Sequence, residues 1–277
     1  FLECADPFLA KSLKDERVLS HIDETKTIDL YREYMVYGGY PRAVLADNKE
    51  EKRSVLQEIY SSYVERDVVA LMEIRNKASF SRLVKLIGWQ IGQLVNIQEL
   101  ATSLAVDRMT VGRYLFGLEE TFILHRLAPY YNNPRQEIVK MGKAYFLDLG
   151  IRATALDDFS GIDERKDKGA VLENAVFIEL ARVCRKRGGK IHFWRTKQKT
   201  EVDFVIELGR ELIPIEVKYN MSGATLSPGM IGFIKKFEPK KAIVATLIKP
   251  ESVIRGAPAP VSIAYPYELG DIFARNV

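Results

Sequence analysis

Three residues in the second half of the chain have the types and spacing to hold a divalent cation and act on a phosphate: Asp203, Glu216 and Lys218. Side chains alternate along a strand, so Glu216 and Lys218 share one side of the run 212–218, and a neighbouring strand can bring Asp203 beside them. Mg²⁺ and Mn²⁺ prefer hard oxygen ligands of this kind. A bound cation acidifies water and neutralises charge on phosphate, while a lysine orients that water. The spacing therefore predicts a divalent-cation site.

The elements that must hold these residues can be read from the pattern around them. A helix is predicted over 169–184, with Glu173 in its first turns, and strands over 191–194, 201–206 and 212–218. The turn 207–210 makes the last two strands a hairpin, on which Asp203 and Phe204 should face opposite sides. A helix over 230–237 and an apolar strand over 241–248 follow. The predicted order is helix, three strands, helix, strand.

The first half of the chain has a helical pattern. Residues 8–76 read as helices broken at the Gly-Gly-Tyr-Pro segment 38–41, and another helix follows over 80–92. Asn96 and Asp107 are placed to cap two short helices joined by a tight turn, which predicts a helix-turn-helix. The β-like runs 122–131 and 143–147 flank residues 132–135, which predicts the wing of a winged helix.

These patterns together predict an α+β protein in three parts: a helical region over 1–75, a winged helix-turn-helix over 76–154 and an α/β domain over 155–277. The outward side of the second short helix offers Arg108, Thr110 and Arg113 to DNA, a small set of contacts followed by two glutamates. The alternative is that this module docks a protein or a neighbouring domain.

Basic residues are concentrated in the third part. Residues 155–277 contain 20 Lys and Arg against 16 Asp and Glu, whereas residues 1–154 balance at 21 of each. Residues 181–200 have no acidic side chain and form a basic strip that attracts anions. The predicted nucleic-acid contacts there are Arg185, Lys186, Arg187, Trp194, Arg195 and Lys197, with Trp194 available to stack on a base. The alternative is an ordinary solvated helix end and hairpin.

Composition excludes several classes of protein. The chain has no apolar run long enough to span a bilayer and no secretory signal, and its two cysteines, Cys4 and Cys184, exclude a disulfide framework or zinc cluster. We therefore expect a cytoplasmic protein without a membrane partner; the sequence leaves oligomerisation open. His125 and His192 lack ligand-spaced partners, and Cys184 reads as a partly buried helix residue.

The residues of the predicted cation site, together with Glu173, resemble the motif of a known superfamily. Glu173, Asp203 and Glu216-Val217-Lys218, on a helix and two strands, look like the PD-(D/E)xK nucleases, and the gap between Asp203 and Glu216 is similar to that in archaeal Holliday junction resolvases. The resemblance implies a restriction-endonuclease-like fold, metal binding by Asp203 and Glu216, metal or water binding by Glu173, and activation of the nucleophile by Lys218. Val202 stands where the motif has proline, which is a departure.

A wider resemblance runs through many short motifs, including 34–41, 65–68, 143–150, 172–174, 194–196 and 214–218. They look like the C-terminal part of prokaryotic AAA+ ATPases that carry the "domain of unknown function 4143". The resemblance implies an N-terminal ATPase domain as the chain's own partner, and ATP as a cofactor of that domain only, because this sequence has no P-loop. The chain also begins without Met, so we expect it to be a piece of a longer protein.

Three interpretations follow. The first is an enzyme, a Mg²⁺-dependent nucleic-acid hydrolase of the nuclease type, with DNA as the favoured substrate. The second is a domain with a nuclease-like fold that serves a structural role only, in which Glu216 and Lys218 form an ordinary ion pair. The third is a non-catalytic regulatory module of an AAA+ ATPase that binds DNA or protein.

Overall fold

The structure is a computed structural model that describes residues 1–14, 21–131, 141–221, 223, 225–250, 254 and 256–274. Two compact units can be distinguished: Phe1–His125 with Phe146–Lys168, and Arg126–Tyr145 with Gly169–Val277. The sequence-based division at 75 and 154 stays a prediction.

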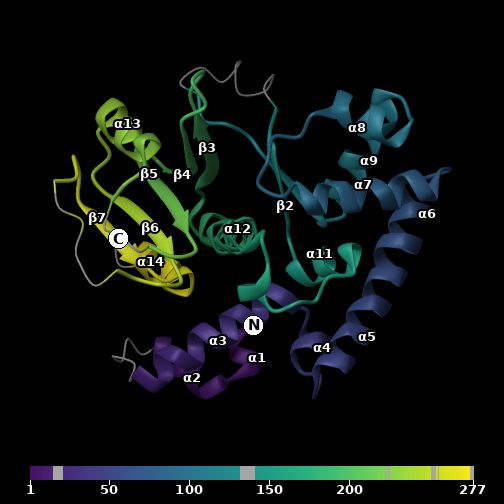
Figure 1. The fold of residues 1–277 in the computed structure, drawn as a ribbon, viewed down its shortest axis with the longest axis horizontal. Helices are drawn as coiled ribbons and strands as arrows, with labels where there is room; N and C mark the ends of the chain where they lie inside the picture. Colours follow the sequence, from purple (N-terminus) through teal and green to yellow (C-terminus); the bar gives the residue numbers. More distant parts are fainter. Residues whose placement is uncertain are drawn as a thin grey trace. The chain divides into compact units, whose positions relative to one another are not determined.

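The first unit is built from helices. Residues Tyr60–Val68 are π-helical and join α5 to α6, so that the two form one continuous rod in Figure 1. The helices are α1 (Leu2–Ala5), α2 (Pro7–Lys14), α3 (His21–Tyr37), α4 (Pro41–Val44), α5 (Lys49–Ile59), α6 (Val69–Leu71), α7 (Lys77–Trp89), α8 (Ile97–Leu104), α9 (Arg108–Glu120) and α11 (Leu149–Leu156), with a short 3-10 turn at Ile162–Glu164. The helices predicted over this region are confirmed, whereas α11 was not predicted.

The break between α3 and α4 has a tertiary cause. Gly38 adopts a left-handed φ of 71°, which favours glycine. The N–H of Gly39 donates to Asp148 Oδ2 at 2.8 Å, and Asp148 Oδ1 caps α11 by accepting from the N–H of Ile151. A Cβ on Gly38 would lie 2.3 Å from Asp148 Oδ1. The Gly-Gly segment is therefore the place where the chain packs closely against the start of α11.

Helices α8 and α9 form the predicted pair joined by a tight turn. The Asn96 side chain caps α8, Ala105 ends it with a left-handed φ of 53°, and the Asp107 side chain caps α9. Strands β1 (Leu124–Leu127) and β2 (Lys143–Phe146) then pair in a two-stranded sheet. Residues 132–135, predicted as the wing, lie outside the described residues.

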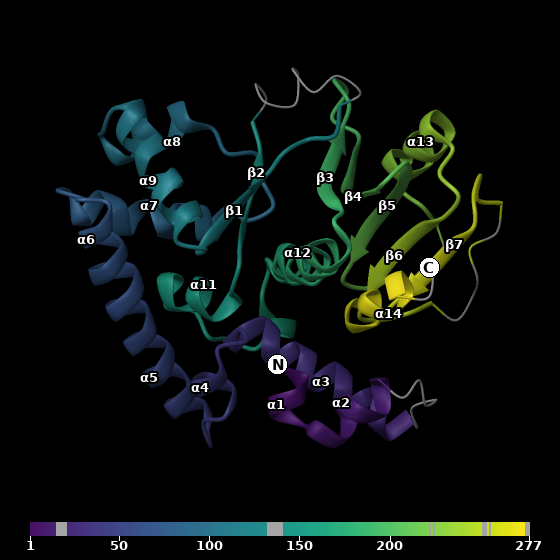
Figure 2. The ribbon, with the colours of Figure 1, turned by 180° about the vertical axis from the view of Figure 1, so that it is seen from behind.

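The second unit contains a five-stranded sheet in the order β3-β4-β5-β6-β7 (Figures 1 and 2). Strand β4 pairs antiparallel with both β3 and β5, whereas the β5–β6 and β6–β7 pairs are parallel. The predicted order of elements is confirmed, and β7 and α14 extend it. The elements are α12 (Lys168–Arg187), β3 (Lys190–Arg195), β4 (Glu201–Leu208), β5 (Glu211–Lys218), α13 (Pro228–Phe237), β6 (Ala242–Thr246), β7 (Val261–Ala264), a 3-10 turn at Pro266–Glu268 and α14 (Leu269–Ala274).

Aromatic clusters pack on β4 from two sides. Phe177 of α12 stacks on Tyr145 of β2 with ring centroids 4.7 Å apart, and both contact Phe204. Val205, the next residue, belongs instead to a core with Trp194 and Phe233 of α13. Adjacent strand residues point to opposite faces, so α12 and α13 cover different faces of β4. Among the described helices, none is long and apolar enough to cross a bilayer.

Candidate functional site

The strand that carries Asp203 contains a β-bulge. In the β3–β4 ladder His192 lies opposite Val205, whereas Trp194 lies opposite Val202. One residue of β3 therefore faces two residues of β4, which are Asp203 and Phe204. A bulge redirects side chains and bends the strand. It places Val202 and Val205 in the same core cluster and interrupts the simple alternation that the sequence predicted for Asp203.

Asp203 lies where β4 and β5 separate. The ladder between these strands reaches Phe204 opposite Ile215. Beyond that pair, the N–H of Val217 donates to Asp203 Oδ2 at 2.8 Å. A side-chain carboxylate thus accepts the hydrogen bond at the end of the ladder. This contact holds the Asp203 carboxylate beside the chain segment that carries Glu216 and Lys218.

Glu216 and Lys218 form a close ion pair, with 2.8 Å between Lys218 Nζ and Glu216 Oε1. The N–H of Ser227 donates to Glu216 Oε2 at 3.3 Å, and Ser227 is the N-cap of α13. Glu216 is 5% exposed, and its carboxylate lies at the N-terminus of that helix. The Lys218 side chain is 43% exposed and reaches solvent.

Glu173 is held by a second cation that sequence reasoning missed. Glu173 Oε1 accepts from the hydroxyl of Tyr145 at 2.5 Å and lies 3.1 Å from Lys143 Nζ. Lys143 Nζ also lies 2.5 Å from Glu201 Oε1, and the Lys143 side chain is 2% exposed. The available signal was a lysine at the start of the otherwise apolar run 143–147. Such a buried ammonium needs carboxylate partners.

The surroundings of Asp203 shift its pKa. Burial and the nearby charge of Glu173 raise the pKa of Asp203 to about 7, with a further contribution from Glu216, against the opposing effects of Lys143 and the Val217 N–H. Burial lowers the pKa of Lys143, but Glu173, Glu201 and Asp203 outweigh it, so that this pKa is raised overall. A strongly perturbed carboxyl group beside other acids is typical of a functional site.

The structure thus brings Asp203, Glu216 and Lys218 together at one end of the β4–β5 hairpin, with Glu173 close enough to Asp203 to shift its pKa. In the part of the chain that the structure describes, no group of three or more acidic, His or Cys side chains is arranged to hold a metal. Asp203 and Glu216 supply two hard oxygen donors, which fits Mg²⁺ because that ion retains several waters. The metal-ligating role of Glu173 stays a prediction.

The basic strip 181–200 is divided by β3. Arg195 pairs with Glu201 at 2.9 Å, and Lys197 is exposed just beyond that end of the strand. Arg185, Lys186 and Arg187 lie at the end of α12, before the other end of β3. A six-residue strand is about 17 Å long between its first and last residue. The ladder places Arg195 opposite Glu201, close to Asp203, and Lys190 opposite Glu207 at the far end of β4. Of the two parts of the strip, only the one with Arg195 and Lys197 therefore lies at the end of the sheet that carries Asp203.

Trp194 does not match its predicted role. It is 7% exposed, and its ring packs edge-to-face on Phe233 at 5.4 Å within the core beneath α13. The prediction that Trp194 is available to stack on a base is therefore wrong, because apolar side chains cover the ring. Burial raises the pKa of the Cys184 thiol to about 11, and His192 is buried as well, so neither is an exposed reactive group.

Helix α9 presents a mixed surface. Arg108 and Arg113 are exposed as predicted, whereas the Thr110 hydroxyl donates to Asp107 Oδ2 at 2.7 Å as part of the helix cap. Met109 is 85% exposed and Phe116 is 52% exposed on the same helix. This helix therefore offers apolar contacts as well as two cations.

Comparison with known families divides the chain in two. Residues 28–163 match the model of a domain of unknown function, DUF8612, and residues 168–253 match another, DUF4143. The second match confirms the "domain of unknown function 4143" part of the resemblance seen in the sequence.

Similar proteins occur in bacteria and archaea. One from Haemophilus influenzae is 27% identical over 208 residues, which cover 72% of this chain and 48% of that protein. One from Mycobacterium tuberculosis is 28% identical over 183 residues (65% and 41%), and one from Methanocaldococcus jannaschii is 25% identical over 220 residues (76% and 47%). All three are described as uncharacterized proteins. The chain spans less than half the length of each.

Among solved structures, the chain is similar to a crystal structure of a Vibrio cholerae protein with 12% sequence identity. The alignment covers 79% of this chain and 55% of the Vibrio cholerae chain, and its TM-score is 0.25. A score this low does not establish a shared fold.

Proposed function

We propose that the second unit is a Mg²⁺-dependent nuclease domain of the PD-(D/E)xK type, following a winged helix and attached in the full protein to an AAA+ ATPase. One observation carries the proposal: Asp203 accepts a hydrogen bond from Val217 where β4 and β5 part, beside the Glu216–Lys218 pair. Two acids and a lysine, from both strands of the hairpin, thereby share one of its ends. We place the protein in the cytoplasm.

Each residue has a separate role in this proposal. Asp203 and Glu216 would hold Mg²⁺ or Mn²⁺, which supplies an acidified water and neutralises charge on the scissile phosphate. The Lys218 ammonium reaches solvent and can orient that water or contact a phosphate oxygen. Lys143 forms an ion pair with Glu173, so we assign it the role of positioning Glu173 near Asp203.

The substrate is nucleic acid, with DNA favoured, and would approach the end of the sheet where Arg195 and Lys197 lie. These cations share that end with Asp203, whereas Arg185, Lys186 and Arg187 belong to the other end of β3. Arg108, Thr110 and Arg113 of α9 would provide a second contact surface. Phosphate contacts of this kind bind without reading sequence.

Cleavage of labelled single- and double-stranded DNA in Mg²⁺ or Mn²⁺ tests the proposal. We expect Asp203→Asn, Glu216→Gln and Lys218→Ala each to lower the rate by about a hundredfold or more. Glu211→Gln, at the opposite end of the same hairpin, is the matched control and should cleave like the wild type. Cleavage that survives all three substitutions would remove the assignment.

A non-catalytic module that binds DNA or protein is the second candidate. The favouring observation is that cations of the protein itself already neutralise the carboxylates: Lys143 pairs with Glu173 and Glu201, and Lys218 pairs with Glu216. Calorimetric titration of Mn²⁺ into the wild type and Asp203→Asn separates the two. If both proteins release the same heat on binding Mn²⁺ and neither cleaves DNA, the non-catalytic binding module is the better interpretation.

A further inference from the structure

The Lys143 ammonium lies among three carboxylates at the candidate site. Its Nζ is 2.5 Å from Glu201 Oε1 and 3.1 Å from Glu173 Oε1, and the third carboxylate is that of Asp203. Burial lowers the pKa of Lys143, but the three carboxylates outweigh it, so the group stays charged at neutral pH. The side chain is 2% exposed and belongs to the first residue of β2. This ammonium is therefore a fixed part of the site rather than a surface charge.

Protein cations occupy the carboxylate oxygens that a second metal ion would need. Glu201 uses both of its oxygens, Oε1 for Lys143 and Oε2 for Arg195, the latter at 2.9 Å. Oε1 of Glu173 contacts Lys143 and also accepts from the Tyr145 hydroxyl. Two-metal sites hold their ions about 3.5–4 Å apart, which requires further oxygen ligands beside the first ion. At this site, an ammonium lies where such ligands converge.

The formal charge of the site favours one divalent cation. With every group ionised, four carboxylates and three cations give a net charge of −1. The groups counted are Glu173, Glu201, Asp203 and Glu216, with Lys143, Arg195 and Lys218. One divalent cation reverses the sign of this charge, so a second ion would have to enter a positively charged site. Without the Lys143 ammonium, Glu173 and Glu201 lose the cation that they share, and their side chains are 18% and 21% exposed to solvent.

We propose that the Lys143 ammonium takes the place of a second divalent cation, so that the site binds a single Mg²⁺ or Mn²⁺ through Asp203 and Glu216. The inference rests on the proposed nuclease function, because it concerns the cation site of that function. It gives Lys143 a role beyond positioning Glu173, since its charge neutralises oxygens that a two-metal site would offer to the second ion. Glu201 then anchors Lys143 instead of binding metal.

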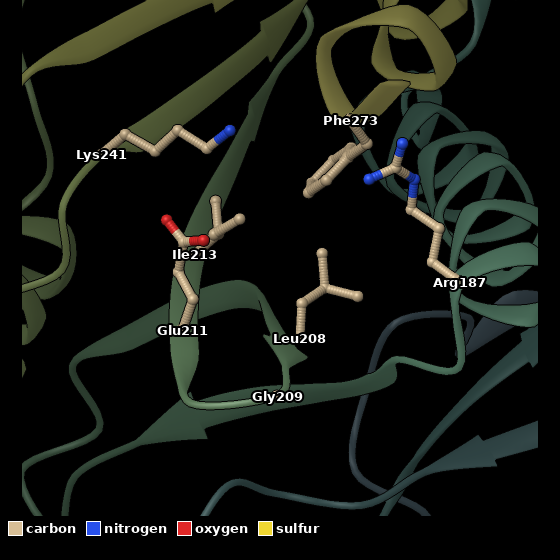
Figure 3. A pocket seen from close by; sticks show the side chains of 7 residues that line it. All are labelled: Arg187, Leu208, Gly209, Glu211, Ile213, Lys241 and Phe273. Carbon is tan, nitrogen blue, oxygen red and sulfur yellow. The ribbon is translucent and has the colours of Figure 1, made fainter. Parts of the chain in front are cut away.

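The other end of the β4–β5 hairpin offers a matched control. A pocket of about 250 Å³ there contains Lys241 and Glu211, whose side chains are shown in Figure 3 and whose charges interact. Among the lining residues that the structure describes, only Glu211 carries a carboxylate. Leu208 in this pocket is about 17 Å along β4 from Asp203. Removal of the Lys241 ammonium therefore leaves one carboxylate, which is too few to hold a divalent cation.

The number of Mn²⁺ ions bound by the whole chain tests the inference, measured by calorimetry and by the electron paramagnetic resonance signal of free Mn²⁺. We expect about one ion per chain for the wild type and Lys241→Met, and about two for Lys143→Met, with dissociation constants of about 1 mM or tighter. Adding Glu201→Gln to Lys143→Met should remove the second ion. Mn²⁺ should also raise the Tm of Lys143→Met by more than that of the wild type, because the ion replaces the lost partner of Glu173 and Glu201.

A second variant covers the case in which Lys143→Met does not fold. Lys143→Gln removes the charge but keeps a hydrogen-bond donor, and we again expect about two ions. One ion in these variants, two ions in the wild type, or a second ion that survives Glu201→Gln would overturn the inference and leave the proposed function intact. Variants that stay unfolded in excess Mn²⁺ would also count against it, since the ion should replace the ammonium. No bound ion in the wild type would remove the proposed cation site, and this inference with it.

Discussion

The main-chain N–H of Val217 donates to the Asp203 carboxylate at 2.8 Å, although the two residues belong to different strands and lie 14 positions apart. The contact lies at the β4 bulge, next to the Phe204–Ile215 pair at this end of the β4–β5 ladder. The bulge therefore determines where the most perturbed carboxyl group of the candidate site lies.

Asp203→Asn should stabilise the protein at high pH. The pKa of Asp203 is raised from 3.8 to about 7, so the folded state favours the protonated carboxyl group. The stability that this group contributes to the fold is complete below about pH 4 and is lost as the pH rises through about 7. The amide does not titrate, and we expect the variant to gain on the order of 2 kcal/mol over the wild type at pH 8 but little at pH 4. Urea unfolding across this range measures the difference. Parallel stability curves would contradict the pKa shift.

Lys143→Met should destabilise the second unit by about 3 kcal/mol, because it leaves Glu173 and Glu201 without their buried partner. Lys190→Met removes an exposed lysine at the start of β3 and is the matched control, with an expected change within about 0.5 kcal/mol. Thermal unfolding of both variants at neutral pH measures the effect. Equal losses for the two would show that the ion pairs contribute little.

Neutralising the Asp203 end of the basic strip should weaken DNA binding more than neutralising the α12 end. We expect Lys197→Gln with Lys199→Gln to reduce the slope of log affinity against log salt by about 1 to 2, and Arg185→Gln with Lys186→Gln to leave it nearly unchanged. Fluorescence anisotropy with labelled DNA at several salt concentrations gives both slopes. The reverse ranking would place the nucleic acid at the other end of the sheet.

Gly38→Ala should cost at least about 2 kcal/mol of unfolding free energy, since φ is left-handed and a Cβ would meet Asp148 Oδ1 at 2.3 Å. Gly112→Ala is the opposite case, because a Cβ at that position in α9 meets nothing within 4 Å. Its better helix propensity should stabilise the protein by up to about 1 kcal/mol. Chemical denaturation compares the two, and a similar loss in both would rule out the Asp148 contact as the cause.

Local patterns predicted most of the secondary structure. The caps at Asn96 and Asp107, the turn after α8 and the β4–β5 hairpin all lie where hydrogen bonding between near neighbours favours them. Strand β7 and helices α11 and α14 were missed because they are short and depend on partners far away in sequence. Short segments gain most of their stability from packing rather than from intrinsic propensity.

For the candidate site, the sequence by itself determined the residue types, their order and the hairpin whose two strands carry Asp203, Glu216 and Lys218, since hairpin pairing follows from local geometry. Only the tertiary structure decided that Lys143 holds Glu173, that Trp194 is buried and that the basic strip is split between two ends of β3. Those outcomes depend on contacts between distant segments and on a one-residue bulge, neither of which leaves a periodic pattern in the chain.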